Sequence, residues 1–84
     1  MRLLLQQRPD GREAPRFVQL QLQPDLLGGW ELLRESGQIG GRSTLRRDLY
    51  ADQTSALSAL ESARDAQLKR GFQLVFAQGA DAPK

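Results

Sequence analysis

The residues of this sequence whose types and spacing could do chemistry are arginines. Four of them gather with an aromatic in the middle of the chain, as Arg34, Arg42, Arg46, Arg47 and Tyr50. Guanidinium groups neutralise phosphates, and an aromatic ring can stack on a base or a sugar. This cluster is therefore typical of a nucleic-acid site. A solvated, salt-bridged surface is the other interpretation of scattered arginines.

The sequence contains few residues that could act in catalysis. Cysteine and histidine are both absent, which excludes thiolate nucleophiles, imidazole bases, disulfides and the usual zinc ligands. The acidic residues form no clustered acid, base or nucleophile motif. The segment GQIGG, residues 37–41, lacks the endings and spacing of the phosphate-binding glycine motifs. We expect a protein that is not an enzyme and uses no cofactor and no metal.

Length and composition predict one small soluble domain. The chain has 84 residues, 39% hydrophobic and 26% charged, with a net charge of +2. Its longest apolar run near the start, residues 3–5, is far too short for a signal peptide or a membrane span. We expect a cytoplasmic protein without a membrane partner.

The first half of the chain predicts strands, which would position the arginines that follow. Residues 1–7 predict a short edge strand, and the polar segment RPDGREAP, residues 8–15, predicts a loop. RFVQLQLQ alternates from Arg16, with Val18, Leu20 and Leu22 on one face, as a half-buried strand does. PDLLGG predicts a hairpin connection, and a second alternating strand follows at residues 30–35 with Trp30 on its apolar face.

The second half of the chain predicts a basic strand, a helix and a last strand. In residues 42–50, regular alternation places Leu45 and Leu49 on one face and arginines with Tyr50 on the other. Asp52 is a suitable N-cap for a helix whose apolar spacing includes Leu60, and Gly71 suits its C′ position. Residues 72–76 predict a strand with Phe72, Leu74 and Phe76 on one face.

This order of elements predicts an α+β fold: an antiparallel sheet of four to five strands with one helix on one face. We divide the chain into an N-terminal edge strand and loop at 1–15, a domain at 16–77 and a flexible tail at 78–84.

The segment RFVQLQLQPDLLGGWELLRESGQIG, with the basic strand and the helix that follow, resembles the WGR domain. WGR domains occur in poly(ADP-ribose) polymerases and as short stand-alone bacterial proteins, and the resemblance is to the bacterial branch. LQPDLLGGW is its most specific part. The resemblance implies a WGR-like fold and a non-enzymatic module that grips DNA near a 5′ end.

The signature motif of the family is changed in this chain. Ser36 stands where the family has its tryptophan, Gly37 keeps the glycine, and Gln38 stands where the family has its arginine. The resemblance implies that the tryptophan packs on the terminal sugar and that the arginine contacts the backbone. The predicted nucleic-acid-binding residues are therefore Arg34, Ser36, Gly37, Gln38, Arg42, Arg46 and Arg47.

Two hypotheses follow. In the first, the chain binds DNA ends or nicks through phosphate contacts without reading bases. In the second, it is a protein-interaction or regulatory module that has lost DNA binding, and it contacts a protein partner or another copy of itself. The oligomeric state is left open between monomer and homodimer.

Overall fold

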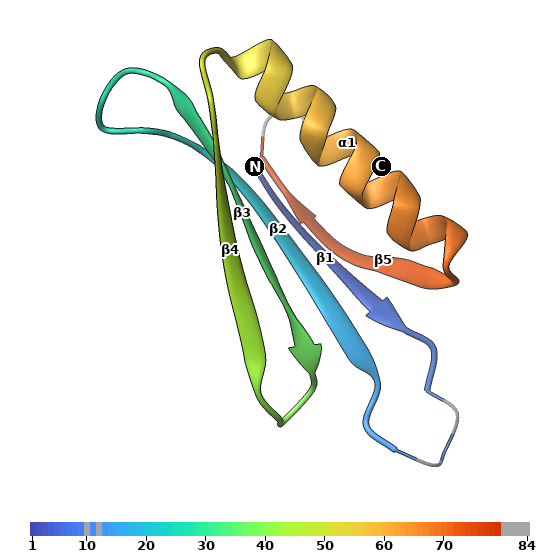
Figure 1. Ribbon diagram of the computed structural model, residues 1–84. Coiled ribbons are helices and arrows are strands. Elements are labelled where there is room, and N and C mark those ends of the chain that lie inside the picture. The colour runs from blue at the N-terminus through green and yellow to red at the C-terminus, as the bar shows by residue number, and fades with distance from the viewer. Residues whose placement is uncertain (10, 12, 80–84) are drawn as a thin grey trace.

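The computed structural model describes residues 1–9, 11 and 13–79. Five strands and one helix follow one another in the predicted order. Their bounds are β1 Arg2–Gln7, β2 Arg16–Pro24, β3 Trp30–Gln38, β4 Ser43–Tyr50, α1 Gln53–Lys69 and β5 Phe72–Gln78. The α+β prediction is confirmed, since the five strands form one antiparallel sheet and the helix packs on one of its faces (Figure 1).

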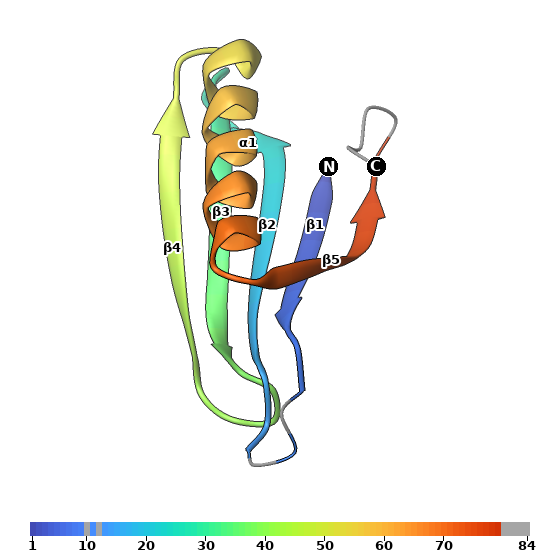
Figure 2. The same cartoon turned by 90° about the vertical axis from the view of Figure 1, so that its right-hand side faces the viewer.

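The strand order in the sheet is β4-β3-β2-β1-β5. Four strands therefore follow one another as neighbours, and α1 then carries the chain across one face of the sheet from the β4 edge to the β5 edge (Figures 1 and 2). The prediction that the first strand lies at an edge is wrong. β1 pairs with β2 on one side and with β5 on the other, because the helix returns the chain beside it, a long-range contact that no local pattern encodes.

The core lies between the sheet and α1. The alternation predicted for β2 is confirmed, since Leu20 and Leu22 are buried and Val18 packs against the same core. Leu32 of β3 is also buried, and Trp30 and Tyr50 are half-buried at its margin. The buried apolar residues are Leu3, Leu5, Leu20, Leu22, Leu32, Ala56, Leu60, Ala63 and Phe72.

The ends of α1 follow from its capping residues. The backbone N–H of Ser55 donates to the Asp52 carboxylate over 2.7 Å, which satisfies a donor that the first turn leaves without a helical partner. At the other end Arg70 is the C-cap, and Gly71 takes a φ of 91°. A side chain there would be strained, which explains why a glycine ends the helix. Near this end of the helix, the Asp65 carboxylate lies 3.0 Å from Nε of Arg64.

The last strand departs from its predicted alternation. Leu5 lies opposite Leu74, but Leu4 lies opposite Phe76, so the β1–β5 register shifts by a residue at Val75. A bulge of this kind reverses which side chains face the core. Phe76 therefore lies on the face away from the helix, 43% exposed and under the Arg2 guanidinium, whose carbon is 5.3 Å from the ring centre.

The predicted tail begins too early. Gln78 still belongs to β5, where its side-chain oxygen accepts a hydrogen bond from Arg2 over 3.2 Å. The remainder of the predicted tail, residues 80–84, lies outside the described residues, as do positions 10 and 12 of the predicted loop. Within the described ranges no helix is both long and apolar enough to span a membrane.

Candidate functional site

The pairing of β3 with β4 sorts the predicted site residues between the two faces of the sheet. Arg34 lies directly opposite Arg46, and Ser36 lies directly opposite Thr44. Residues opposite each other in an antiparallel pair share a face, and residues two apart on one strand do so as well. Because Leu32 is buried against the helix, Arg34, Ser36 and Arg46 lie on the helix side of the sheet.

A pocket of about 170 Å³ opens on this side, between the sheet and the C-terminal half of α1. Polar and cationic side chains from three elements meet there. The lining residues are Arg16, Phe17, Val18, Leu20, Arg34, Ser36, Ala63, Gln67, Arg70 and Phe72.

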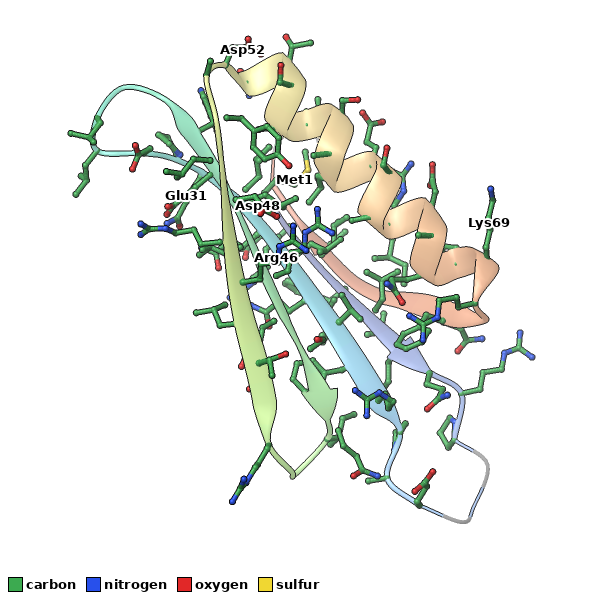
Figure 3. All side chains as sticks on the ribbon, in the orientation of Figure 1. Met1, Glu31, Arg46, Asp48, Asp52 and Lys69 are labelled. Carbon is green, nitrogen blue, oxygen red and sulfur yellow. The ribbon has the colours of Figure 1, made fainter. Side chains whose placement is uncertain are left out.

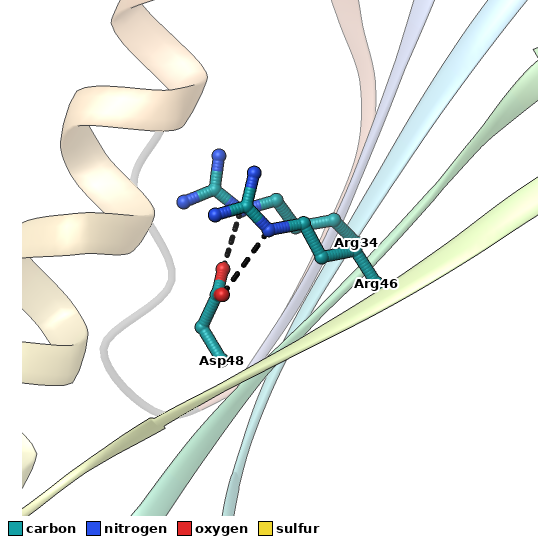
Figure 4. A network of polar contacts seen from close by, with 3 residues as sticks. All are labelled: Arg34, Arg46 and Asp48. Atoms are coloured by element: carbon teal, nitrogen blue, oxygen red, sulfur yellow. Dashed lines mark hydrogen bonds and ion pairs between the residues drawn. The ribbon is translucent and has the colours of Figure 1, made fainter.

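Asp48 holds two of the arginines near this pocket. Its carboxylate lies 3.1 Å from Nε of Arg46 and 3.3 Å from Nε of Arg34 (Figure 4). The contact with Arg46 is also a hydrogen bond. The contact with Arg34 is an ion pair only, because Arg34 Nε and Asp48 Oδ2 are buried and form no hydrogen bond with any described residue. Figure 4 shows the two guanidinium groups side by side next to the Asp48 carboxylate. Their outer nitrogens form no hydrogen bond with another described residue, so these donors can serve a ligand.

Two further arginines of the pocket were missed by the sequence prediction. Arg16 comes from the start of β2 and Arg70 from the end of α1. The Arg70 guanidinium carbon lies 5.8 Å from the centre of the Phe72 ring, in cation–π range. Within the described ranges neither arginine has a carboxylate within 4.0 Å. The one sequence signal that could have indicated either residue is the position of Arg70 at the predicted end of the helix.

Gln67 provides the pocket with a hydrogen-bond acceptor. Its Oε1 is buried and has no partner among the described residues. The pocket therefore combines guanidinium donors with one unsatisfied amide oxygen, an arrangement suited to a ligand that is anionic and also carries a donor group.

Gln38 and Gly37 stabilise the end of β3 and its packing against the neighbouring backbone. The Gln38 side chain donates to the carbonyl of Ala14 over 2.9 Å, and the Ile39 N–H donates to Pro15 over 3.0 Å, so this end of β3 holds the loop before β2. Gly37 is buried, and a Cβ at this position would overlap the carbonyl oxygen of Arg42. Arg42 itself is exposed in the turn that joins β3 to β4.

Arg47 lies on the other face of the sheet. It is opposite Leu33, and its Nε is 3.5 Å from the carboxylate of Glu31, which is only 6% exposed and also accepts a hydrogen bond from Gln23. Figure 3 shows Glu31 on the far side from the helix, and Asp48 with Arg46 on the helix side. The predicted set is therefore divided, and Arg47 neutralises a buried carboxylate.

No group of three or more acidic side chains that could hold a metal ion occurs in the part of the chain that the structure describes. Comparison of the chain with protein-family models, with curated proteins and with solved structures found no match in any of the three.

Proposed function

We propose that this chain is a non-enzymatic, WGR-type module that binds DNA through its backbone phosphates. The observation that carries the proposal is the convergence of Arg16, Arg34, Arg46 and Arg70 on the helix side of the sheet, which we name the cationic face. Within the described residues, Asp48 pairs with Arg34 and Arg46, and no carboxylate lies within 4.0 Å of Arg16 or Arg70. Such an excess of positive charge attracts a polyanion and gives salt-dependent affinity.

The charge pattern favours phosphate contacts over base reading. The cationic face carries guanidinium groups that line or lie near an open pocket, where they can donate hydrogen bonds to the oxygens of successive phosphates. Base reading would require an element that enters a groove, whereas the pocket of the cationic face lies between the sheet and α1. We therefore expect affinity with little sequence preference.

The proposal revises which residues bind. Arg34, Ser36 and Arg46 remain, Arg16 and Arg70 are added, and Arg42 can contribute charge from the turn. Gln38 and Arg47 are engaged with Ala14 and Glu31, so they lie outside the revised set. The family resemblance supports DNA ends as the preferred target, with the change at Ser36 removing an aromatic contact.

Fluorescence anisotropy tests the proposal, with a 5′-phosphorylated duplex end and an unbroken duplex as probes, each titrated over a range of salt concentrations. Arg46→Gln and Arg47→Gln form a matched pair, because the two residues are adjacent and each change removes one charge, but from opposite faces. We expect Arg46→Gln to weaken binding and to reduce the salt slope by about one unit, and Arg47→Gln to leave the slope unchanged.

A second variant examines the changed signature. Ser36→Trp with Gln38→Arg returns both family residues, and an added stacking contact is worth about 1 to 3 kcal/mol. If the natural chain binds neither probe while this variant binds DNA ends, the chain has kept the WGR-like fold and lost DNA binding. Equal losses from Arg46→Gln and Arg47→Gln, or binding that does not weaken with salt, would contradict the proposal and favour a protein-interaction module.

A further inference from the structure

The β4 strand offers an open sheet edge. It pairs with β3 without a register shift from Ser43 to Tyr50, and within the described residues nothing pairs with its other side (Figures 1 and 2). Proteins commonly protect such edges with a bulge, a proline or charged side chains. β5, the other edge, has a bulge. β4 has no bulge and no proline; it carries the charged residues Arg46, Arg47 and Asp48, and it exposes Leu45 by 68% and Leu49 by 58%.

The sequence of β4 is complementary to itself when it is reversed. Residues opposite each other in an antiparallel pair lie on the same face, so a symmetric pairing of two β4 strands must have its two-fold axis at a residue. An axis at Arg47 places Arg46 opposite Asp48 of the second copy, and Leu45 opposite Leu49 of the second copy. Each of these pairs then occurs twice, one on each side of the axis.

We propose that β4 is a self-association edge, which pairs antiparallel with β4 of a second copy of this chain about an axis at Arg47. The pairing runs from Thr44 to Tyr50 and joins two five-stranded sheets into one. It covers the two exposed leucines with apolar partners and gives the mostly exposed Arg46 a second carboxylate. The two Arg47 side chains meet at the axis, where each is already paired with Glu31 of its own chain.

The neighbouring registers lack this complementarity. An axis at Arg46 sets the two Arg46 side chains against each other, and it places Leu45 opposite Arg47 of the second copy. An axis at Asp48 opposes two carboxylates and leaves Leu49 opposite Arg47 of the second copy. Each of these three axes opposes one pair of like charges. Of the three, the axis at Arg47 adds the two Arg46–Asp48 pairs and the two Leu45–Leu49 pairs, and opposite-charge and apolar pairs contribute favourably, so this axis is selected.

Sedimentation velocity and light scattering across the micromolar to millimolar range test the edge. We expect a dimer whose fraction rises with protein concentration. Leu45→Lys with Leu49→Lys sets like charges opposite each other and should raise the dimer dissociation constant at least about tenfold. The matched control is Leu26→Lys with Leu27→Lys, because those leucines are 102% and 93% exposed in the hairpin between β2 and β3.

Cross-linking tests the register. The chain contains no cysteine, so Leu45→Cys with Leu49→Cys introduces a thiol pair that the proposed axis brings within disulfide range in the dimer. We expect this double variant to form a covalent dimer joined between positions 45 and 49 under mild oxidation. Leu45→Cys alone should form far less, because its two copies are separated by four positions along the strands.

Thermal melts establish that each variant is folded before its association is compared. A wild-type chain that stays monomeric throughout the range would overturn the proposal, as would equal effects of the edge and hairpin lysines. Equally efficient cross-linking of the single and double cysteine variants would overturn the register.

Discussion

Arg34 of β3 and Arg46 of β4 lie directly opposite each other on the helix side of the sheet, and the carboxylate of Asp48 lies within 3.3 Å of both. Two like charges in this position repel, so the carboxylate between them stabilises the sheet. The same carboxylate opposes the binding of an anion. Asp48 therefore links the stability of the cationic face to the affinity for phosphates that we propose for it.

Asp48→Asn separates these two effects with little change of shape. We expect the free energy of unfolding to fall by about 1 kcal/mol, since the partly exposed ion pairs are lost. The affinity for duplex DNA should rise, because the cationic face keeps its arginines and loses its negative charge. Denaturant titration and anisotropy measure the two quantities, and an unchanged or lowered affinity would show that phosphates bind elsewhere.

Leu60→Ala tests the packing of α1 against the sheet. Leu60 is fully buried, so we expect a loss of about 2 to 5 kcal/mol in unfolding free energy. Leu68→Ala is the control, because Leu68 lies in the same helix and is 43% exposed, and the change in helix propensity is the same. Urea unfolding followed by circular dichroism compares the two, and similar losses would mean that the helix face is assigned wrongly.

Gly37→Ala tests whether the retained glycine of the signature motif is structural. The added methyl group would overlap backbone atoms of Arg42 and Ser43, which cannot move aside as a flexible side chain can. We expect a loss of about 1 to 3 kcal/mol in unfolding free energy. Ser36→Ala, one position away at a half-buried site, should change it by no more than about 0.5 kcal/mol. Thermal unfolding of both variants measures these losses. A Gly37→Ala protein as stable as the natural chain would show that the glycine is not required for the fold, and would favour a role for Gly37 in ligand binding.

Asp52 predicts a pH dependence of stability. Hydrogen bonds from Ser55 hold the pKa of Asp52 below its ordinary value. The backbone N–H of Ser55 has the larger effect and the Ser55 hydroxyl the smaller. Since the folded-state pKa is the lower one, this contribution is fully present above the unfolded-state pKa of about 3.9 and is lost as the pH falls through the folded value. The cap therefore weakens in acid.

Asp52→Asn isolates this effect, because asparagine caps helices as well as aspartate and does not titrate. We expect the melting temperatures of the natural chain and the variant to be close at neutral pH and the natural chain to lose more as the pH falls below about 4. Asp52→Ala should melt lower at neutral pH. Parallel melting curves for the natural chain and Asp52→Asn at every pH would exclude the cap as a source of acid sensitivity.

Elements with a strong local pattern were predictable from the sequence. β2 alternates apolar and polar residues without interruption, and α1 has a capping aspartate before it and a glycine after it, so propensity, pattern and capping agree. The alternation of β5 was clear as well, but a bulge at Val75 reversed its last residues. A bulge depends on the pairing with β1, which the local sequence does not specify.

The candidate site was predicted in part, for a similar reason. Arg34, Ser36 and Arg46 lie together because β3 and β4 are a hairpin with a register that local alternation indicates. Arg16 and Arg70 join them across long stretches of chain, through the packing of α1 on the sheet. Arg47 was placed with Arg46 by proximity in sequence, although adjacent residues of a strand face opposite sides.

By itself the sequence determined the fold class, the order of the elements, the caps of the helix and the absence of histidine and cysteine chemistry, because these depend on residue type and on periodicity within a few positions. Only the tertiary structure decided that β1 lies inside the sheet, that four arginines share one face, that Arg47 serves Glu31 and that β4 is left as an open edge. The physical reason is that each of these depends on which distant segments pair and on which side of the sheet the helix packs.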